Sequence, residues 1–146
     1  AWARFSAFER FEGMLVEEMV AGDVELIVGA KNDAQFGPVV LLGMGGVAVE
    51  IYRDTSIRMA PLREKDVSSM VEGLVARRLI EGYRGSPPVD MKALTRTMLL
   101  FSEFAMELAP WIDSIDLNPV MCAADRCVVA DARIVLGGLQ GGKERP

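Results

Sequence analysis

Short runs of apolar residues, separated by glycine, asparagine and aspartate, dominate the first sixty positions of the chain. Such runs are typical of strands, and the residues between them are typical of turns. The strands predicted here are residues 13–20, 24–30, 39–42, 47–52 and 56–60. The first two, joined by a turn at residues 21–23, are expected to pair as an antiparallel hairpin.

The spacing of apolar residues becomes helical after residue 63. It predicts one helix from Glu64 to about Ile80 and a second that begins at the N-cap Asp90 and ends near Leu108. Residues 114–121 and 127–134 then read as two strands joined by a turn at 123–126. Strands joined by hairpins, with the helices grouped together, predict an α+β fold: a mostly antiparallel sheet with two main helices on one face.

The composition is that of an ordinary globular domain, with 51% hydrophobic and 25% charged residues among 146. A net charge of −5 without a basic cluster argues against a nucleic-acid partner, and no apolar run reaches the roughly 20 residues of a membrane span. We expect a cytoplasmic protein with a truncated segment over residues 1–12, a folded domain over 13–136 and a flexible tail over 137–146. Since histidine is absent, a bound metal would be held by oxygen, which favours magnesium, calcium or manganese.

The predicted final hairpin carries the best candidates for chemistry. Side chains alternate between faces of a strand, so Asp116 and Asn118 are expected on one face, with Asp131 opposite Asn118 on the return strand. A carboxylate and an amide oxygen on adjacent strands suit Mg²⁺ and leave positions for phosphate oxygens. The alternative is a solvated polar face, which is common in half-buried sheets. Cys122 and Cys127 flank the turn as a redox pair, half a metal site or, most simply, two small residues in adjacent strands.

Three further features lie in the predicted strands of the first part. The glycine loop from Gly43 to Gly46 suits a phosphate cradle or merely a tight turn, and it matches no nucleotide-binding fingerprint. Glu17 and Glu18 are neighbours and should face opposite ways. Glu25 stands in an apolar stretch, where a buried carboxylate needs a partner or a ligand; simple strand alternation would also place it there.

Five stretches occur in one order along the chain: LVEEMVAGDVELIVGAKNDAQFGPVVLLGMGGVAVEI, RMAPL, EGYRGSPPVD, IDLNPV and VVADARIVL. Taken together, this series resembles the ATP-grasp domain of ADP-forming acetyl-CoA synthetases and, more distantly, the β-subunit of succinyl-CoA synthetase. The resemblance implies the C-terminal half of an ATP-grasp fold that binds ATP or ADP with Mg²⁺. In that family acyl-CoA, ADP and phosphate interconvert with acid, CoA and ATP through a phosphohistidine on another domain.

The resemblance also implies a role for each candidate residue. Backbone groups of Glu17, Glu18 and Met19 would read the adenine edge, and Glu25 would contact the nucleotide at its ribose. Gly45 and Gly46 would lie near the nucleotide end of the sheet. The implied magnesium ligands are Asn118 and Asp131, and Asp116 would face the incoming phosphohistidine loop.

The expected partners are a nucleotide, the other half of the ATP-grasp fold, and the CoA-binding and phosphohistidine domains. This chain alone is expected to be inactive, since those parts are not in it. A nucleotide-sensing regulatory domain fused to a protein lysine acetyltransferase is the alternative function, because such proteins are similar over this region.

Overall fold

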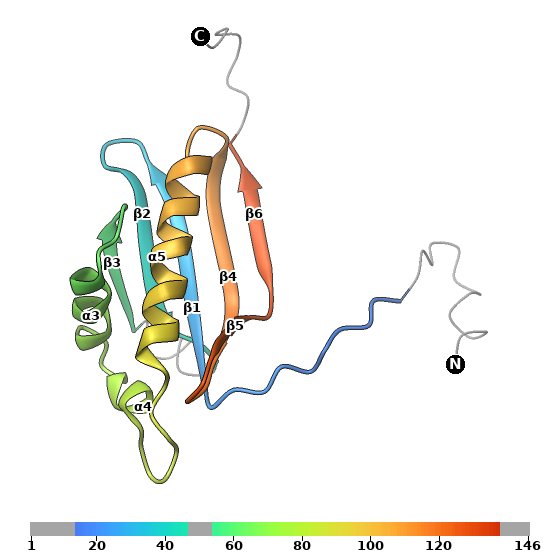
Figure 1. Ribbon diagram of the computed structural model, residues 1–146. Coiled ribbons are helices and arrows are strands. Elements are labelled where there is room, and N and C mark those ends of the chain that lie inside the picture. The colour runs from blue at the N-terminus through green and yellow to red at the C-terminus, as the bar shows by residue number, and fades with distance from the viewer. Residues whose placement is uncertain (1–13, 47–53, 138–146) are drawn as a thin grey trace, which may run out of the picture.

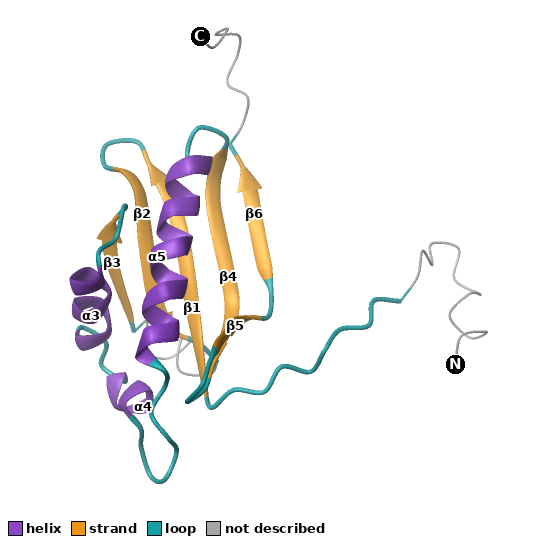
Figure 2. Ribbon diagram, viewed as in Figure 1, coloured by secondary structure: helices purple, strands orange, loops and turns teal. Residues whose placement is uncertain are grey.

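The computed structural model describes residues 14–46 and 54–137, which form an antiparallel sheet with its helices on one face (Figures 1 and 2). This confirms the predicted α+β class. The sheet order is β3-β2-β1-β4-β5, and β6 also pairs with β4. The strands are β1 (Val24–Asp33), β2 (Gly37–Met44), β3 (Thr55–Met59), β4 (Ile112–Cys122), β5 (Cys127–Val129) and β6 (Ala132–Leu136). The helices are α3 (Glu64–Glu72), α4 (Arg77–Glu81) and α5 (Met91–Leu108).

The core lies between the sheet and α5, the long helix that lies over the sheet in Figure 1. Every second residue of β1 points toward the helices, and Leu26 and Val28 are fully buried there. They meet the apolar stripe of α5, where Leu94 and Met98 are also fully buried. Each such side chain contributes about 1.5–3 kcal/mol relative to exposure. The opposite face of the sheet has no helix over it in the described part of the chain.

Helix α5 begins where the sequence predicts. The Asp90 carboxylate accepts hydrogen bonds from the N–H groups of Lys92 (2.9 Å) and Ala93 (3.1 Å), which caps the first turn. A cap of this kind is worth roughly 1 kcal/mol. The Asp90 N–H in turn donates to the Ala123 carbonyl (2.9 Å). The start of the helix is thereby attached to the turn that follows β4. Within the described residues, no helix is long and apolar enough to cross a membrane.

The hairpin predicted from residues 13–20 and 24–30 is wrong over the described positions, because residues 14–22 form no strand. The reason is that both edges of β1 are already occupied. One edge pairs with β2, and the other pairs with β4 from a distant part of the sequence. Residues 14–20 instead leave the sheet as an extended segment, blue in Figure 1. The strand predicted for 47–52 lies outside the described residues. The other predicted strands, 24–30, 39–42 and 56–60, correspond to β1, β2 and β3.

Two predicted elements are divided. The helix expected from Glu64 to Ile80 stops at Glu72 and resumes at Arg77 as α4. The buried carboxylate of Asp54 accepts hydrogen bonds from the N–H groups of Val75 (2.7 Å) and Ala76 (2.8 Å). These bonds hold the chain in a turn between α3 and α4. The return strand predicted from 127 to 134 is likewise split into β5 and β6, with residues 130–131 between them.

Candidate functional site

Two of the candidate residues, Asp116 and Glu25, lie on the sheet face that carries no helix. Asp116 of β4 lies opposite Gly29 of β1 on one side and opposite Arg133 of β6 on the other. Its neighbour Ile115 is buried toward α5, so alternation along the strand directs Asp116 to the bare face, where it is exposed. Glu25 lies opposite Met121 in the same way and is also exposed.

A pocket of about 420 Å³ opens at the end of the sheet where β1 begins and β2 ends. It brings together Glu25, Gly45 and Gly46, three of the predicted nucleotide-binding residues. The other residues lining it are Gly22, Asp23, Val24, Met44, Leu79, Tyr83 and Ser86. Strands supply one side of the pocket, while α4 and the loop after it supply the other.

The two glycines let the chain approach Glu25 closely. The Gly45 N–H donates to the Glu25 carbonyl at 2.7 Å, and a Cβ on Gly45 would lie only 2.9 Å from the Glu25 carbonyl carbon and oxygen. Gly46 has a φ of +65°, and a Cβ there would lie 3.1 Å from Oε2 of Glu25. The glycine loop is therefore required by its contact with Glu25, a physical reason the sequence pattern alone does not give.

Asn118 and Asp131 are opposite each other, as the sequence predicts. The Asn118 N–H donates to the Asp131 carbonyl at 3.1 Å, and the Ala130 N–H donates to the Pro119 carbonyl at 2.9 Å. The Asn118–Pro119 peptide bond is cis, and the register between β1 and β4 shifts at this point. Both side chains are exposed. Oδ1 of Asp131 accepts the N–H of Ala132 at 2.8 Å, which fixes the orientation of the carboxylate.

The donor chemistry of this pair fits a hard divalent cation. Amide and carboxylate oxygens are the ligands that Mg²⁺ takes from proteins, and one or two of them leave room for water and phosphate oxygens. In residues 14–46 and 54–137, no three His, Cys, Asp or Glu side chains come together in a way that could hold a metal. Asn118 and Asp131 alone would leave most coordination positions of such a cation to water or to a bound ligand.

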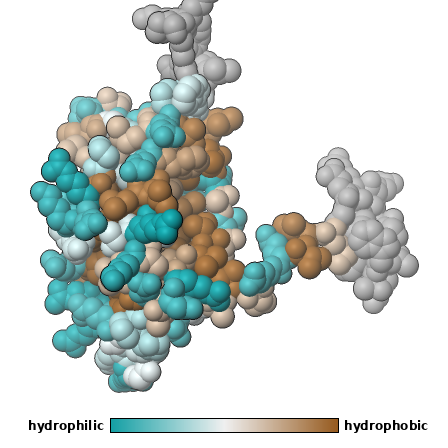
Figure 3. Space-filling model, in the orientation of Figure 1, coloured by the Kyte–Doolittle hydropathy of each residue, from teal (hydrophilic) through white to brown (hydrophobic). Residues whose placement is uncertain are grey.

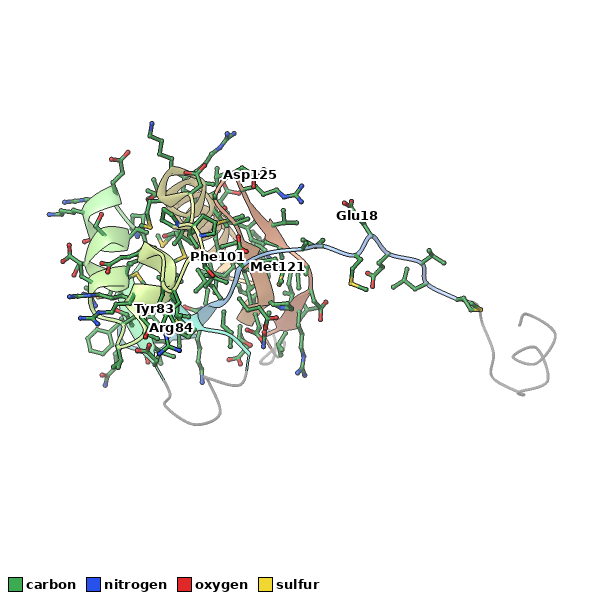
Figure 4. The ribbon with its side chains drawn as sticks, turned by 90° about the horizontal axis from the view of Figure 1, so that it is seen from below. Glu18, Tyr83, Arg84, Phe101, Met121 and Asp125 are labelled. Atoms are coloured by element: carbon green, nitrogen blue, oxygen red, sulfur yellow. The ribbon has the colours of Figure 1, made fainter. Side chains whose placement is uncertain are left out.

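Glu17, Glu18 and Met19 are not brought to the pocket. They lie on the extended segment, where Met19 is 92% exposed, and Figure 4 shows Glu18 well away from the sheet. Leu15 and Val16 on the same segment are also exposed. A segment this apolar and this open contacts little of the described chain, so any role in binding a base would require additional structure around it.

Sequence reasoning missed two residues that shape the pocket. Asp54 is only 5% exposed, and its bonds to the turn before α4 position the helix that carries Leu79 into the pocket wall. Tyr83 lines the pocket, and the guanidinium of Arg84 stacks over its ring at 5.3 Å from the centroid (Figure 4). For Asp54 the one available signal was a carboxylate two residues before a predicted strand, which is too common to be informative.

Comparison with known proteins assigns this arrangement to a family. The family model described as the ATP-grasp domain matches residues 2–136. The chain belongs to the ATP-grasp family. Among curated relatives, this ATP-grasp domain is 43% identical over 128 residues to acetate–CoA ligase [ADP-forming] I of Archaeoglobus fulgidus, covering 88% of the chain and 18% of that protein. It is 39% identical over 124 residues to the β subunit of acetate–CoA ligase [ADP-forming] I of Pyrococcus furiosus, covering 85% of the chain and 53% of that subunit.

A solved structure agrees with these relatives. The dinucleotide-forming acetyl-coenzyme A synthetase 1 of Ca. Korarchaeum cryptofilum, in complex with coenzyme A, Ca-AMPCP and HgCl⁺, superposes on the ATP-grasp domain with a TM-score of 0.82 at 43% identity. The match covers 88% of this chain and 56% of that one. The chain is thus homologous to ADP-forming acyl-CoA synthetases over its ATP-grasp region. It spans about half the length of that solved chain and 18% of the length of the A. fulgidus ligase.

Proposed function

We propose that this chain is the nucleotide- and Mg²⁺-binding part of an ADP-forming acyl-CoA synthetase, which converts acyl-CoA, ADP and phosphate into acid, CoA and ATP. The observation that carries the proposal is the shared sheet face: Glu25 with its glycine pocket at one end, and Asn118 opposite Asp131 further along. Homology to ADP-forming ligases, with a nucleotide analogue in one solved relative, supports it.

Each part of the face has a proposed task. The Glu25 carboxylate accepts hydrogen bonds from ribose hydroxyls, and Gly45 and Gly46, which approach Glu25 closely, line the pocket beside it. Backbone groups of Glu17, Glu18 and Met19 read the base edge once the other half of the fold covers that segment.

The phosphate end of the face belongs to the other candidates. Asn118 and Asp131 hold Mg²⁺, which when bound neutralises phosphate charge during phosphoryl transfer. Asp116, on the same face, is the proposed catalytic residue, because its carboxylate can orient the imidazole of a phosphohistidine loop from another domain. Positioning and electrostatics of this kind account for most of the catalysis in phosphoryl transfer.

The bare face supplies only one wall of a nucleotide site, which explains the expected dependence on partners. The remaining ATP-grasp half would cover the nucleotide, and the phosphohistidine and CoA-binding domains would supply the other reactants. In this proposal residues 13–136 are the folded unit, and the isolated chain produces no ATP from acyl-CoA, ADP and phosphate.

Calorimetric titration of ADP into the complete protein that carries this chain, with and without Mg²⁺, tests the metal pair. Asp131→Ala and Asn118→Ala should each weaken Mg²⁺-dependent ADP affinity by at least about tenfold, since even residues that only support metal ligands typically contribute 10–100-fold. Glu107→Ala is the matched control, because it removes one exposed carboxylate from α5 on the other side of the sheet. Unchanged Mg²⁺ dependence of ADP affinity in both variants would refute the assignment of the metal pair. ATP synthesis by the isolated chain would refute the proposal that it needs its partner domains.

A further inference from the structure

Cys122 and Cys127 face each other across the hairpin between β4 and β5. Two backbone hydrogen bonds define their pairing. The Ala123 N–H donates to the Arg126 carbonyl (2.8 Å), and the Ala130 N–H donates to the Pro119 carbonyl (2.9 Å). Hydrogen-bonded and non-hydrogen-bonded pairs alternate along an antiparallel ladder, so these bonds make the cysteines a non-hydrogen-bonded pair. The Cα atoms of such a pair are about 4.5 Å apart, which is within the range of disulfide-bonded cysteines.

The two thiols differ in access to solvent. Cys122 is fully buried on the helix side of the hairpin, whereas Cys127 is half-buried. The hydrogen bond between the thiols and the burial of Cys122 raise the pKa of Cys122. The same hydrogen bond lowers the pKa of Cys127, against the opposing effects of burial and of the nearby Asp90 charge. Cys127 is accordingly the thiol that is both reachable and more easily ionised, and Cys122 is its protected neighbour.

A basic groove of about 560 Å³ leads to Cys127 between the start of α5 and the hairpin turn. Lys92 and Arg96 of α5 and Arg126 of the turn line it. The only carboxylate among the lining residues is Asp90, which already caps the helix. In the described part of the chain the one ion pair is between Arg77 and Glu81, so these three cations have no carboxylate partner there. The groove is positive on a chain whose net charge is −5.

We propose that Cys122 and Cys127 form a redox-active dithiol, which a small anionic disulfide such as glutathione disulfide oxidises to an internal disulfide. The groove attracts the reagent by charge and presents it to Cys127. This site lies on the helix side of the hairpin, and its chemistry does not depend on the proposed nucleotide binding.

The reaction proceeds in two exchange steps. The Cys127 thiolate attacks one sulfur of glutathione disulfide, the S–S bond breaks, and one glutathione leaves as a thiolate that takes up a proton. Cys122 then loses its proton to solvent and attacks the Cys127 sulfur of the mixed disulfide, releasing the second glutathione. The protein loses two electrons and two protons, and glutathione disulfide gains them as two thiols.

Peptide mapping of the complete protein measures this directly, because trypsin cleaves after Arg126 and places the two cysteines in different peptides. After incubation with glutathione disulfide, alkylation and digestion, the two peptides should be found joined. A mixed disulfide on Cys127 should precede the joined form. In Cys122→Ser the reaction should stop at that mixed disulfide, and in Cys127→Ser the remaining Cys122 should stay unmodified in the folded protein.

The role of the groove is tested by comparing oxidation by anionic glutathione disulfide with oxidation by the cationic disulfide cystamine. Lys92→Gln/Arg96→Gln should lower the anion-over-cation rate ratio by about fivefold or more, since charge-lined clefts raise association rates by 10–10³. Lys65→Gln/Arg78→Gln removes the same two charge types from exposed positions on α3 and α4 and should leave the ratio unchanged. First modification at Cys122, a wild-type protein that stops at the mixed disulfide, or equal ratios in both double variants would overturn the proposal.

Discussion

A methyl group added at Gly45 is expected to destabilise the chain through its effect on a single neighbour. The Cβ of Gly45→Ala would lie 2.9 Å from the carbonyl carbon, the carbonyl oxygen and the Cβ of Glu25. Two of these three atoms belong to the backbone, so no side-chain rotation relieves the overlap. The same carbonyl oxygen accepts the Gly45 N–H at 2.7 Å, so the two strands are held together at the place where the methyl group must fit.

The size of the effect follows from the displacement required. Ordinary contact begins at about 3.4 Å, so β1 and the end of β2 must separate by roughly 0.5 Å. Overpacking of this kind costs about 1–3 kcal/mol of unfolding free energy. Gly29→Ala is the matched control, because its Cβ would meet nothing closer than 3.6 Å in the middle of β1. That variant should be neutral or more stable by about 0.4–1 kcal/mol, since alanine lowers the entropy of the unfolded chain.

Urea unfolding of the two variants, followed by far-UV circular dichroism, separates steric overlap from a general effect of replacing glycine. The midpoint should fall for Gly45→Ala and stay or rise for Gly29→Ala, with equal slopes in both cases. Equal stabilities of Gly45→Ala and wild type would refute the close approach of Gly45 to Glu25. Such a result would also remove the structural reason given above for the glycine loop.

Three further outcomes follow from side chains that bond to the backbone. Asp54→Ala should lower the unfolding free energy by about 2–3 kcal/mol in urea titrations, because it leaves two N–H groups before α4 without their charged acceptor. Ser102→Ala should cost about 1–3 kcal/mol in the same assay, because its buried hydroxyl accepts the Leu62 N–H at 2.8 Å, whereas the exposed Ser68→Ala should stay within about 0.5 kcal/mol. The Asp33 carboxylate accepts hydrogen bonds from two backbone N–H groups, which lower its pKa below the ordinary value of 3.8. Its contribution to stability is therefore complete above that pH and is lost as the pH falls through the lower, folded-state pKa. The difference in unfolding free energy between wild type and Asp33→Ala should accordingly decrease in acid.

The parts of the fold that are local in sequence could be predicted from it. The turn at residues 123–126 sets the register of the last hairpin, which is why Asn118 and Asp131 were correctly placed opposite each other. Helix α5 carries its own N-cap, Asp90, and its own apolar stripe, so both its start and its buried face followed from the pattern.

The failures have non-local causes. The strand over residues 13–20 was predicted on the assumption that it pairs with the next strand along the chain. In the structure β4, about ninety residues after β1, occupies the edge of β1 that this strand would need. The helix over 64–80 is interrupted by a carboxylate from Asp54, which precedes it by many residues. The approach of Gly45 to Glu25 depends on the register of the β1–β2 hairpin. Asp33 lies opposite Gly37 beside the turn and Leu26 lies opposite Met44 at the far end, so the next pair along the strands is Glu25 and Gly45.

The bare sheet face makes the stability of this chain depend on whatever covers it. On that face Ile57 and Met59 of β3 are exposed. Ile134 of β6 lies opposite Ile115, and therefore on the helix side, where it is exposed as well; Figure 3 shows hydrophobic surface along the side of the molecule where β6 lies. An occupant that binds only the folded form adds RT ln(1 + [L]/Kd), about 2.7 kcal/mol at a hundredfold excess over Kd. That is comparable to the full effect of losing Asp54, so a covered domain can tolerate a substitution that would unfold the same chain alone.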